Sequence, residues 1–298
     1  MNKLVSPLPV KNGVSPNSLW LPVGKWASML EFFQDRFPHL DSKSCIARFE
    51  RDEVVTADGA ILRVNSQYIS GTHIFFYREL ESELQVPFEE KIIYQDEHIV
   101  VADKPHFLPV SPSGNYLHET LLVRLRKKLN IDSLELCHRI DRETAGVVLL
   151  TKKTSERAPY HALFSNKKIT KIYHALAGKK DISLPLIHKS RLVKGEPYYK
   201  MREVLGENNS ETEIKLLEEG IENNLYELRP VTGKKHQLRV HLSALGIPIV
   251  NDPIYPTIMN KVSDDFSKPL QLLAKSIHFS DPLSGKEHFF ETDQSLSI

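Results

Sequence analysis

The first candidate for chemistry is an aspartate between two arginines, in the segment Cys137-His138-Arg139-Ile140-Asp141-Arg142. Arg139 and Arg142 place positive charge around Asp141, and nearby positive charge keeps a carboxylic acid ionised at neutral pH. The apolar run Val147–Leu150 follows and predicts a buried strand, so Asp141 is expected in a turn at the edge of a sheet. The spacing alone also fits a turn aspartate that only forms a surface ion pair, and by itself it favours that simpler interpretation.

A second candidate group is the segment Thr232-Gly233-Lys234-Lys235-His236-Gln237-Leu238-Arg239-Val240-His241. Leu238, Leu242 and Leu245 follow one another at helical spacing, which predicts a helix that runs to a C-terminal cap at Gly246. We expect the glycine before this helix to let the chain turn into it. The first free N–H groups of the helix could then bind a phosphate.

The same segment places Arg239 on a helix face with Lys235 and His236, away from the leucines. A metal site built from His236 and His241 is not predicted, because residues five apart do not lie on one face of a helix.

Tyr173 is the third candidate, in the alternating segment Lys171-Ile172-Tyr173-His174-Ala175. Alternation predicts a strand with Lys171, Tyr173 and Ala175 on one side. A tyrosine in such a strand usually packs in a core, so this segment becomes informative only together with the others.

The elements that must position these residues are mainly hairpins. Strands are predicted at Ile92–Tyr94 and Ile99–Ala102, joined by a turn, and at Leu225–Leu228. Thr120–Leu129 reads as a basic amphipathic helix. Because hairpins dominate, the predicted fold class is α+β with a largely antiparallel mixed sheet.

Two domains are expected from the length of 298 residues. Residues 1–20 are rich in Pro, Ser and Asn and predict an arm, residues 21–85 predict a small N-terminal α/β extension, and residues 86–298 predict a larger domain, with the acidic stretch 79–90 at the boundary. The small domain is predicted from helices at 26–33 and 42–49, a hairpin around Asp58-Gly59 and a strand at 73–77.

Net charge, taken alone, argues against a nucleic-acid partner, because 39 Lys and Arg nearly cancel 38 Asp and Glu. The charges are segregated, however. Residues 152–180 carry eight basic residues and one acidic residue, whereas residues 79–103 and 203–227 each carry eight acidic residues and one lysine. Any single run could be a solvated surface, but basic blocks on both sides of the Asp141 loop favour an anionic partner such as RNA.

The two cysteines, Cys45 and Cys137, lie far apart and predict neither a disulfide nor a zinc framework. No apolar run approaches the roughly 20 residues needed to cross a bilayer. The start, Met1–Pro7, lacks the continuous apolar stretch of a secretory signal. A cytoplasmic protein is expected, with a monomer as the default.

Together these segments resemble the RluA-type pseudouridine synthases. The resemblance rests on four groups of residues, in a shared order and spacing: His138-Arg139-Ile140-Asp141 with Thr144 and Gly146, Lys171-x-Tyr173-x-Ala175, Thr232-Gly233-x-x-His236-Gln237-Leu238-Arg239-Val240-His241, and the flanking segments Tyr94–Pro105 and Gly246–Tyr255. It extends from about Phe88 to the C-terminus. Ala145 and Lys234 depart from the family pattern, which often has Ser and Arg there.

The resemblance implies an isomerase that converts uridine in structured RNA to pseudouridine. It implies that Asp141 is the catalytic carboxylate, acting covalently or through a glycal, that Arg239 pairs with Asp141, and that Tyr173 stacks on the uracil and helps to move its C5 proton. The implied RNA contacts are His138, Arg139, Lys171, Lys234, Lys235, His236 and Gln237. No cofactor or metal is expected, because the reaction involves neither net oxidation nor hydrolysis.

Other functions remain open at this point. A catalytically silent RNA-binding protein on the same fold would be free to lose Asp141, Tyr173 or Arg239. A glycosidase would need two carboxylates roughly 5–10 Å apart, and Asp103 and Glu143 lack a supporting motif. The N-terminal extension could bind RNA or serve only as a docking extension. The target could be transfer RNA, 23S ribosomal RNA, or both.

Overall fold

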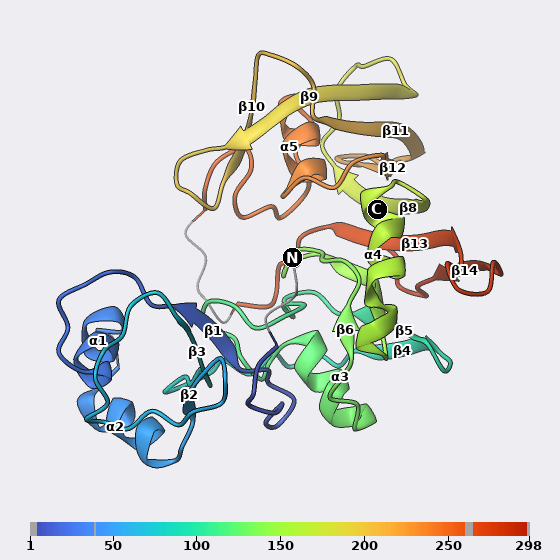
Figure 1. Ribbon diagram of the computed structural model, residues 1–298. Coiled ribbons are helices and arrows are strands. Elements are labelled where there is room, and N and C mark those ends of the chain that lie inside the picture. Colours follow the sequence, from blue (N-terminus) through green and yellow to red (C-terminus); the bar gives the residue numbers. More distant parts are fainter. Residues whose placement is uncertain (1–4, 39, 260–264, 297–298) are drawn as a thin grey trace. The chain divides into compact units, whose positions relative to one another are not determined.

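The computed structural model describes residues 5–38, 40–259 and 265–296, and it divides into two compact units (Figure 1). The small unit comprises Met1–Glu83 and Pro112–His118, and the large unit comprises Leu84–Ser111 and Glu119–Ile298. The first four residues of the predicted arm, and with them most of the segment tested for a secretory signal, lie outside the described residues.

The small unit contains a three-stranded antiparallel sheet in the order β1 (Asn17–Trp20), β3 (His73–Phe76), β2 (Val54–Thr56). Its two helices are α1 (Met29–Arg36) and α2 (Ser42–Glu50). The predicted arm therefore ends sooner than expected, because its last residues pair with β3 as strand β1.

Local capping explains where the helices of the small unit begin. Asp41 accepts a hydrogen bond from the Ser44 N–H at 2.9 Å, as expected for the start of α2. Ser28 caps α1 in the same way through the Glu31 N–H at 3.2 Å, so α1 begins later than its apolar pattern suggested. The predicted hairpin after β2 returns only through a single bridge between Val55 and Ile61.

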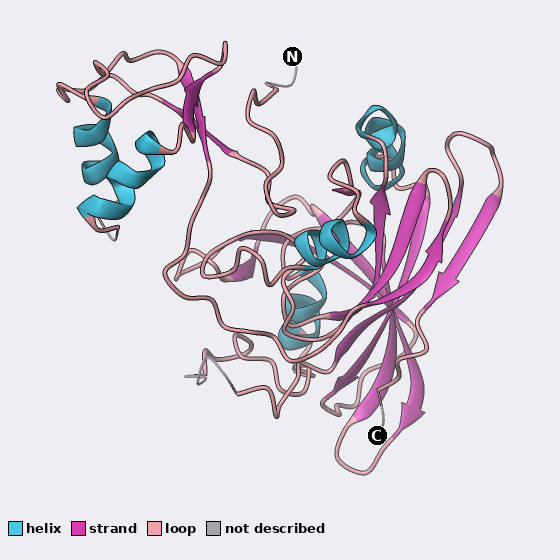
Figure 2. Ribbon diagram, turned by 90° about the horizontal axis from the view of Figure 1, so that it is seen from below, coloured by secondary structure: helices cyan, strands magenta, loops and turns pink. Residues whose placement is uncertain are grey.

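One mixed sheet of eleven strands organises the large unit (Figure 2). Its main path runs β10-β9-β11-β12-β8-β13-β7-β5-β4, while β14 pairs with β13 and β6 with β7. The strands are β4 (Lys91–Gln95), β5 (Ile99–Lys104), β6 (Glu135–Leu136), β7 (Ala145–Thr151), β8 (Ile169–Ala177), β9 (Leu186–Lys194), β10 (Met201–Val204), β11 (Ser210–Glu219), β12 (Asn224–Pro230), β13 (Leu272–Ser280) and β14 (Glu287–Glu291). The β7–β13 pair is parallel and the other pairs are antiparallel. The predicted α+β class with a largely antiparallel sheet is confirmed.

The helices of the large unit are α3 (Leu121–Leu129), α4 (Arg157–Ser165) and α5 (Gln237–Ala244). The predicted basic helix corresponds to α3. The glycine cap predicted after the leucine pattern is present, because Gly246 has φ +81° and its N–H donates to Ser243 O at 3.0 Å. None of the helices among the described residues has the length and apolar character needed to cross a membrane.

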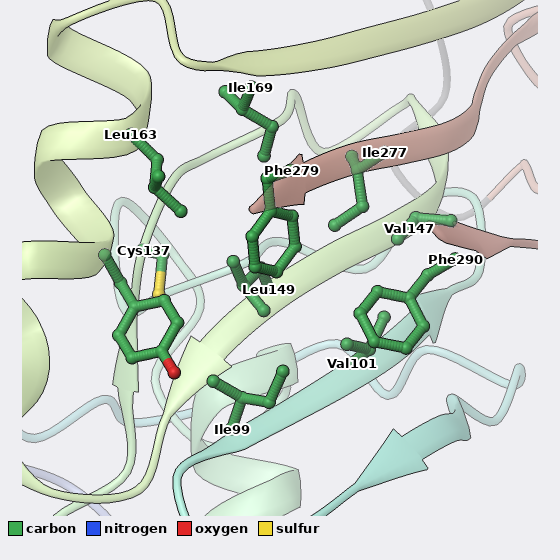
Figure 3. Packing of buried hydrophobic residues seen from close by; sticks show 11 residues of the cluster. Ile99, Val101, Cys137, Val147, Leu149, Leu163, Ile169, Ile277, Phe279 and Phe290 are labelled. Carbon is green, nitrogen blue, oxygen red and sulfur yellow. The ribbon is translucent and has the colours of Figure 1, made fainter. Parts of the chain in front are cut away.

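Strand β7, which follows the Asp141 loop in the chain, contributes Val147 and Leu149 to a hydrophobic core (Figure 3). All of its residues are buried, and Val147 and Leu149 pack with Phe279 of β13 and with Leu163 of α4. Complete burial of such a side chain is worth about 1.5–3 kcal/mol. The loop that carries Asp141 is therefore attached to one of the most firmly packed strands of the sheet.

Gly146 allows β7 to run directly beside β13. Its φ is +109°, and a Cβ atom at this position would lie 2.2 Å from the carbonyl oxygen of Ala274. Only glycine tolerates both the backbone conformation and the close approach. The residue thus fixes where the site loop ends and the sheet begins.

Candidate active site

Lys104, at the end of β5, anchors the loop that carries Asp141. Its buried ammonium donates to the backbone carbonyls of Arg142 at 3.0 Å, Leu108 at 2.8 Å and Pro105 at 2.9 Å. Burial lowers the pKa of Lys104 to about 7. Three carbonyl acceptors nevertheless match the three N–H bonds of the charged form, so the side chain acts as a clamp on the loop.

Two further hydrogen bonds hold the same loop. The His106 ring lies 2.6 Å from the carbonyl oxygen of Glu143, and Arg142 Nε donates to the carbonyl oxygen of Phe107 at 3.1 Å. The Thr144 N–H closes the turn by donating to the carbonyl oxygen of Asp141 at 3.2 Å. The backbone of Asp141 is thereby held in one position relative to the sheet.

Arg239 of α5 connects two carboxylates at the centre of the site. Its Nη1 donates to Asp141 Oδ2 at 3.0 Å, while Nε and Nη2 donate to the two oxygens of Asp252 at 2.8 Å each. The side chains of Arg239 and Asp252 are 1% exposed, whereas that of Asp141 is 26% exposed. Burial alone would lower the pKa of Arg239, but the hydrogen bonds and charges of Asp252 and Asp141 raise it overall.

This arrangement leaves one oxygen of Asp141 available. Among the described residues, none donates a hydrogen bond to Asp141 Oδ1, whereas Asp252 Oδ1 also accepts from the N–H groups of Ile254 at 2.8 Å and Tyr255 at 3.0 Å. The buried carboxylate is thus fully engaged and the partly exposed one is not. Of these two carboxylates, Asp141 is the one that a ligand could reach.

Asp252 is a site residue that reasoning on individual residues missed. Its only signal was its place in the segment Gly246–Tyr255, which formed part of the family resemblance. Nothing in the local sequence indicates that the Asp252 side chain is buried against an arginine 13 residues earlier. This pairing depends on the tertiary structure.

His236 lies between Asp141 and Tyr255. The Tyr255 hydroxyl accepts from the Met201 N–H at 2.7 Å and lies 2.9 Å from His236 Nδ1, so its own proton is available to that nitrogen. The other ring nitrogen, His236 Nε2, faces Asp141 Oδ2 at 3.9 Å. Burial lowers the pKa of His236 to about 4 and raises that of Tyr255 to about 12, so both are uncharged at neutral pH.

Tyr173 and Lys171 approach the site from strand β8, as the alternating pattern predicted. Tyr173 is partly buried, and its hydroxyl forms no hydrogen bond with any residue in the described part of the chain. Burial, and secondarily the charge of Asp141, raise its pKa. Lys171 Nζ donates to the carbonyl oxygen of Thr232 at 3.2 Å, and burial lowers its pKa to about 8. Tyr173 also packs against the hydrophobic cluster that contains Leu238 of α5, the helix that carries Arg239.

The remaining predicted RNA contacts separate into exposed and internal side chains. Arg139, Lys234 and Lys235 are exposed. The His138 ring stacks on Phe164 at 4.5 Å and accepts a hydrogen bond from a backbone N–H of β7 at 3.0 Å. Burial lowers the pKa of His138 to about 3, so this ring is neutral and one of its nitrogens is used inside the protein.

Gln237 differs most from its predicted role in RNA contact. Its side-chain oxygen accepts from the Thr232 hydroxyl at 2.6 Å and from the Lys234 N–H at 3.1 Å. Its side-chain nitrogen donates to Glu211 O and Thr212 Oγ1, each at 2.9 Å. The side chain is buried and satisfied within the protein, so it orders the start of α5 instead of facing outward.

The turn into α5 and the surroundings of this helix also differ from the prediction. His236, with φ +55°, makes the turn, whereas Gly233 is outside the positive-φ region. All residues from Gln237 to Leu242 are buried, because Leu238 and Leu242 pack against one hydrophobic cluster and Val240 packs against another. Arg239 therefore lies inside the protein and not on the predicted surface face.

Comparisons with known proteins indicate the family of this chain. Residues 98–244 match the family model described as RNA pseudouridylate synthase. Ribosomal large subunit pseudouridine synthase D of Pseudomonas aeruginosa is 30% identical over 72% of this chain and 69% of its own. The mitochondrial tRNA pseudouridine(32) synthase of Saccharomyces cerevisiae is 31% identical over 55% of this chain and 37% of its own.

A solved structure leads to the same class of protein. Human RNA Pseudouridylate Synthase Domain Containing 4 superposes with a TM-score of 0.55 at 27% identity, over 68% of this chain and 88% of that one. The chain belongs to the RluA-type RNA pseudouridine synthases, which are isomerases that act on RNA. The resemblance noted in the sequence is thus confirmed at the level of the family and the reaction class.

Proposed function

We propose that this isomerase converts a uridine of a structured RNA to pseudouridine with Asp141 as its catalytic carboxylate. In this reaction the bond between N1 and C1′ breaks, the base turns, and C5 bonds to C1′. The observation that carries the proposal is the buried Arg239, which binds Asp252 with two N–H groups and presents a third to Asp141. The free Oδ1 of Asp141 would supply the electron pair, either to a carbon of the nucleotide or to a proton.

Arg239 has the role of a positioning cation in this proposal. A guanidinium fixed by a buried carboxylate holds the Asp141 side chain in one orientation and places positive charge beside it. His236 lies beside the same carboxylate, with its Nε2 3.9 Å from Asp141 Oδ2. Neither residue needs to change its protonation state during the reaction.

Tyr173 would stack on the displaced uracil. Its raised pKa keeps the phenol uncharged at neutral pH, which suits contact with an uncharged base. Its hydroxyl, without a hydrogen bond to the described residues, is available to help move the proton that C5 must lose. The base has to leave its stack to reach this position, and RNA loops make that step less costly.

RNA contact is best supported for the exposed Arg139, which lies two residues before Asp141, and for the exposed Lys234 and Lys235, which precede the helix that carries Arg239. The small unit offers less support. Residues 1–83 contain nine Lys and Arg against ten Asp and Glu. Of these, Arg48 and Arg51 pair with Glu79, and Arg63 pairs with Asp52. This balance favours a role other than RNA binding for the small unit.

The proposed targets are transfer RNA, large-subunit (23S) ribosomal RNA, or both, because relatives carry names of both kinds. We further propose a monomer that acts in the cytoplasm without a cofactor. Pseudouridines would be mapped in total RNA from a deletion strain complemented with the wild type, Asp141→Asn or the loop control Glu143→Gln. The wild type and Glu143→Gln should restore the missing sites and Asp141→Asn should not. A complete pseudouridine pattern in the deletion strain would instead favour a catalytically silent RNA-binding protein.

A further inference from the structure

A polar cluster lies between the sheet and helix α5, outside the Asp141 site. His188 and Ser190 of β9 are paired in register with Thr212 and Ser210 of β11. Glu203 of β10 and His241 of α5 complete the cluster, and His241 is fully buried. A helix usually packs on a sheet through apolar side chains, so a group of polar residues at this interface requires an explanation.

Three of these side chains bring metal-binding atoms together. His188 Nε2 lies 2.8 Å from Glu203 Oε1, and His241 Nε2 lies 4.0 Å from the same oxygen. The ligand atoms of the three residues all lie within 4.8 Å of one another. Zinc bonds of 2.0–2.2 Å in tetrahedral geometry place neighbouring ligand atoms about 3.3 Å apart, so small side-chain movements would close the site.

The surroundings of His241 match those of a metal ligand. Metal-bound histidines usually donate their second ring N–H to a fixed acceptor. His241 Nδ1 lies 2.9 Å from Thr212 Oγ1, and Thr212 Oγ1 is itself held by Gln237 Nε2 at 2.9 Å. The other nitrogen, Nε2, faces the hydroxyls of Ser210 at 3.0 Å and Ser190 at 3.2 Å. These hydroxyls are hydrogen-bond partners for Nε2 when no ion is bound, and a bound ion would replace them.

Access to the cluster is available from one side. The side chains of His188 and Glu203 are 19% and 23% exposed, whereas His241 is closed off from solvent. An ion could therefore enter beside His188 and Glu203, and water could occupy its remaining coordination position. Within the part of the chain that the structure describes, this is the one group of three potential ligands with such spacing.

We propose that His188, Glu203 and His241 form a binding site for one divalent metal ion of the zinc type. Two imidazole nitrogens and one carboxylate oxygen form a donor set that suits zinc and disfavours magnesium and calcium, which prefer oxygen ligands. The ion would connect strands β9 and β10 to helix α5. Because α5 also carries Arg239, the bound ion would stabilise the helix that positions Asp141.

Metal binding by untagged, full-length protein tests this proposal. Chelator-treated protein would be incubated with zinc, dialysed and assayed for metal content, and cobalt would serve as a spectroscopic probe of tetrahedral coordination. The test variants are His188→Asn and Glu203→Gln, whose partly exposed side chains can change without a cavity in the core. The control is the surface pair His278 and Glu287, whose ligand atoms lie 3.0 Å apart, changed to Asn and Gln.

The wild type and the control variant should each retain about one zinc per chain and give a tetrahedral cobalt spectrum. Each test variant should weaken zinc binding at least tenfold, because mutation even of a residue that only supports a metal ligand typically costs about 10–100-fold in metal affinity. Zinc should raise the melting temperature of the wild type, and this rise should be absent in the test variants. Wild-type protein that retains no zinc, or test variants that bind zinc as tightly as the control, would overturn the proposal and leave the cluster as a hydrogen-bond network.

Discussion

Replacing Asp252 with Asn tests whether a buried ion pair holds the site together. Asn can keep the bonds that Asp252 Oδ1 accepts from Ile254 N–H, Tyr255 N–H and Arg239 Nη2, but its NH₂ group would face Arg239 Nε–H, 2.8 Å away in the native protein. Removing one partner of a buried ion pair costs about 3–5 kcal/mol. Because Asp141 still pairs with Arg239 and three hydrogen bonds survive, we expect a loss of about 2–4 kcal/mol in the free energy of unfolding.

The matched comparison is Asp141→Asn. The Asp141 side chain is 26% exposed, and Arg239 keeps its two bonds to Asp252 when the Asp141 charge is removed. The expected cost is below about 1 kcal/mol, as for partly exposed ion pairs. Two carboxylates that bind the same guanidinium should therefore differ clearly in their effect on stability.

Thermal unfolding and steady-state kinetics give the measurement. For a domain of about 200 residues, the Asp252→Asn loss corresponds to a melting temperature lower by about 5–15 °C. Its kcat should fall about 10–100-fold while KM changes by less than about threefold, because misplacement of Asp141 affects the chemical step more than RNA binding. The reasoning is refuted if Asp252→Asn costs less than Asp141→Asn, or if its loss appears in KM alone.

Three further predictions concern folding, RNA binding and pH. Gly146→Ala should destabilise the protein by more than about 2 kcal/mol in urea unfolding, because the new Cβ meets a backbone carbonyl at 2.2 Å. Changing the exposed Lys167 and Lys168 to Gln should flatten the salt dependence of RNA binding, by up to about 0.7–0.9 in slope for each phosphate that is no longer neutralised. The pKa of His138 is about 3 in the folded protein and about 6.5 when unfolded, so its contribution to stability is lost as pH falls from 6.5 towards 3. That loss should reach about 1.4 kcal/mol per pH unit in urea titrations and diminish in His138→Gln.

The chain offers matched controls for the first two of these predictions. Gly233→Ala should leave stability unchanged, because Gly233 has no positive φ and open space around its Cβ position. Lys153→Gln should leave the salt slope of RNA binding unchanged, because Lys153 is already paired with Glu97 and Glu156. If either control changes as much as its test variant, the corresponding explanation fails.

Local sequence patterns predicted those elements that local rules determine. Helix α2 begins after Asp41, strand β7 contains the apolar run, and α5 ends before Gly246, as expected from capping and burial patterns. Strands were harder to predict in the acidic stretch 203–227. It contains all of β11 and parts of β10 and β12. The alternation of β11 is hidden because two of its buried positions hold the polar residues Ser210 and Thr212.

Contacts between distant segments could not be predicted from residue patterns. Amphipathic spacing placed Arg239 on a surface, but α5 is packed on more than one side and its charged residue is satisfied by Asp252 inside the protein. Gln237 looked like a polar surface residue for the same reason. His188 and Glu203 carried no signal, because they meet His241 only when two strands and a helix come together.

The central claim, that Asp141 carries the reaction, is tested most directly by tritium release from RNA labelled at C5 of uridine. Each isomerisation frees the C5 hydrogen, so the released label counts turnovers. Purified Asp141→Asn should release none above background while binding the same RNA within a few-fold of the wild-type affinity and melting at a similar temperature. Sustained tritium release by this variant, with pseudouridine formed at the same site, would contradict the account.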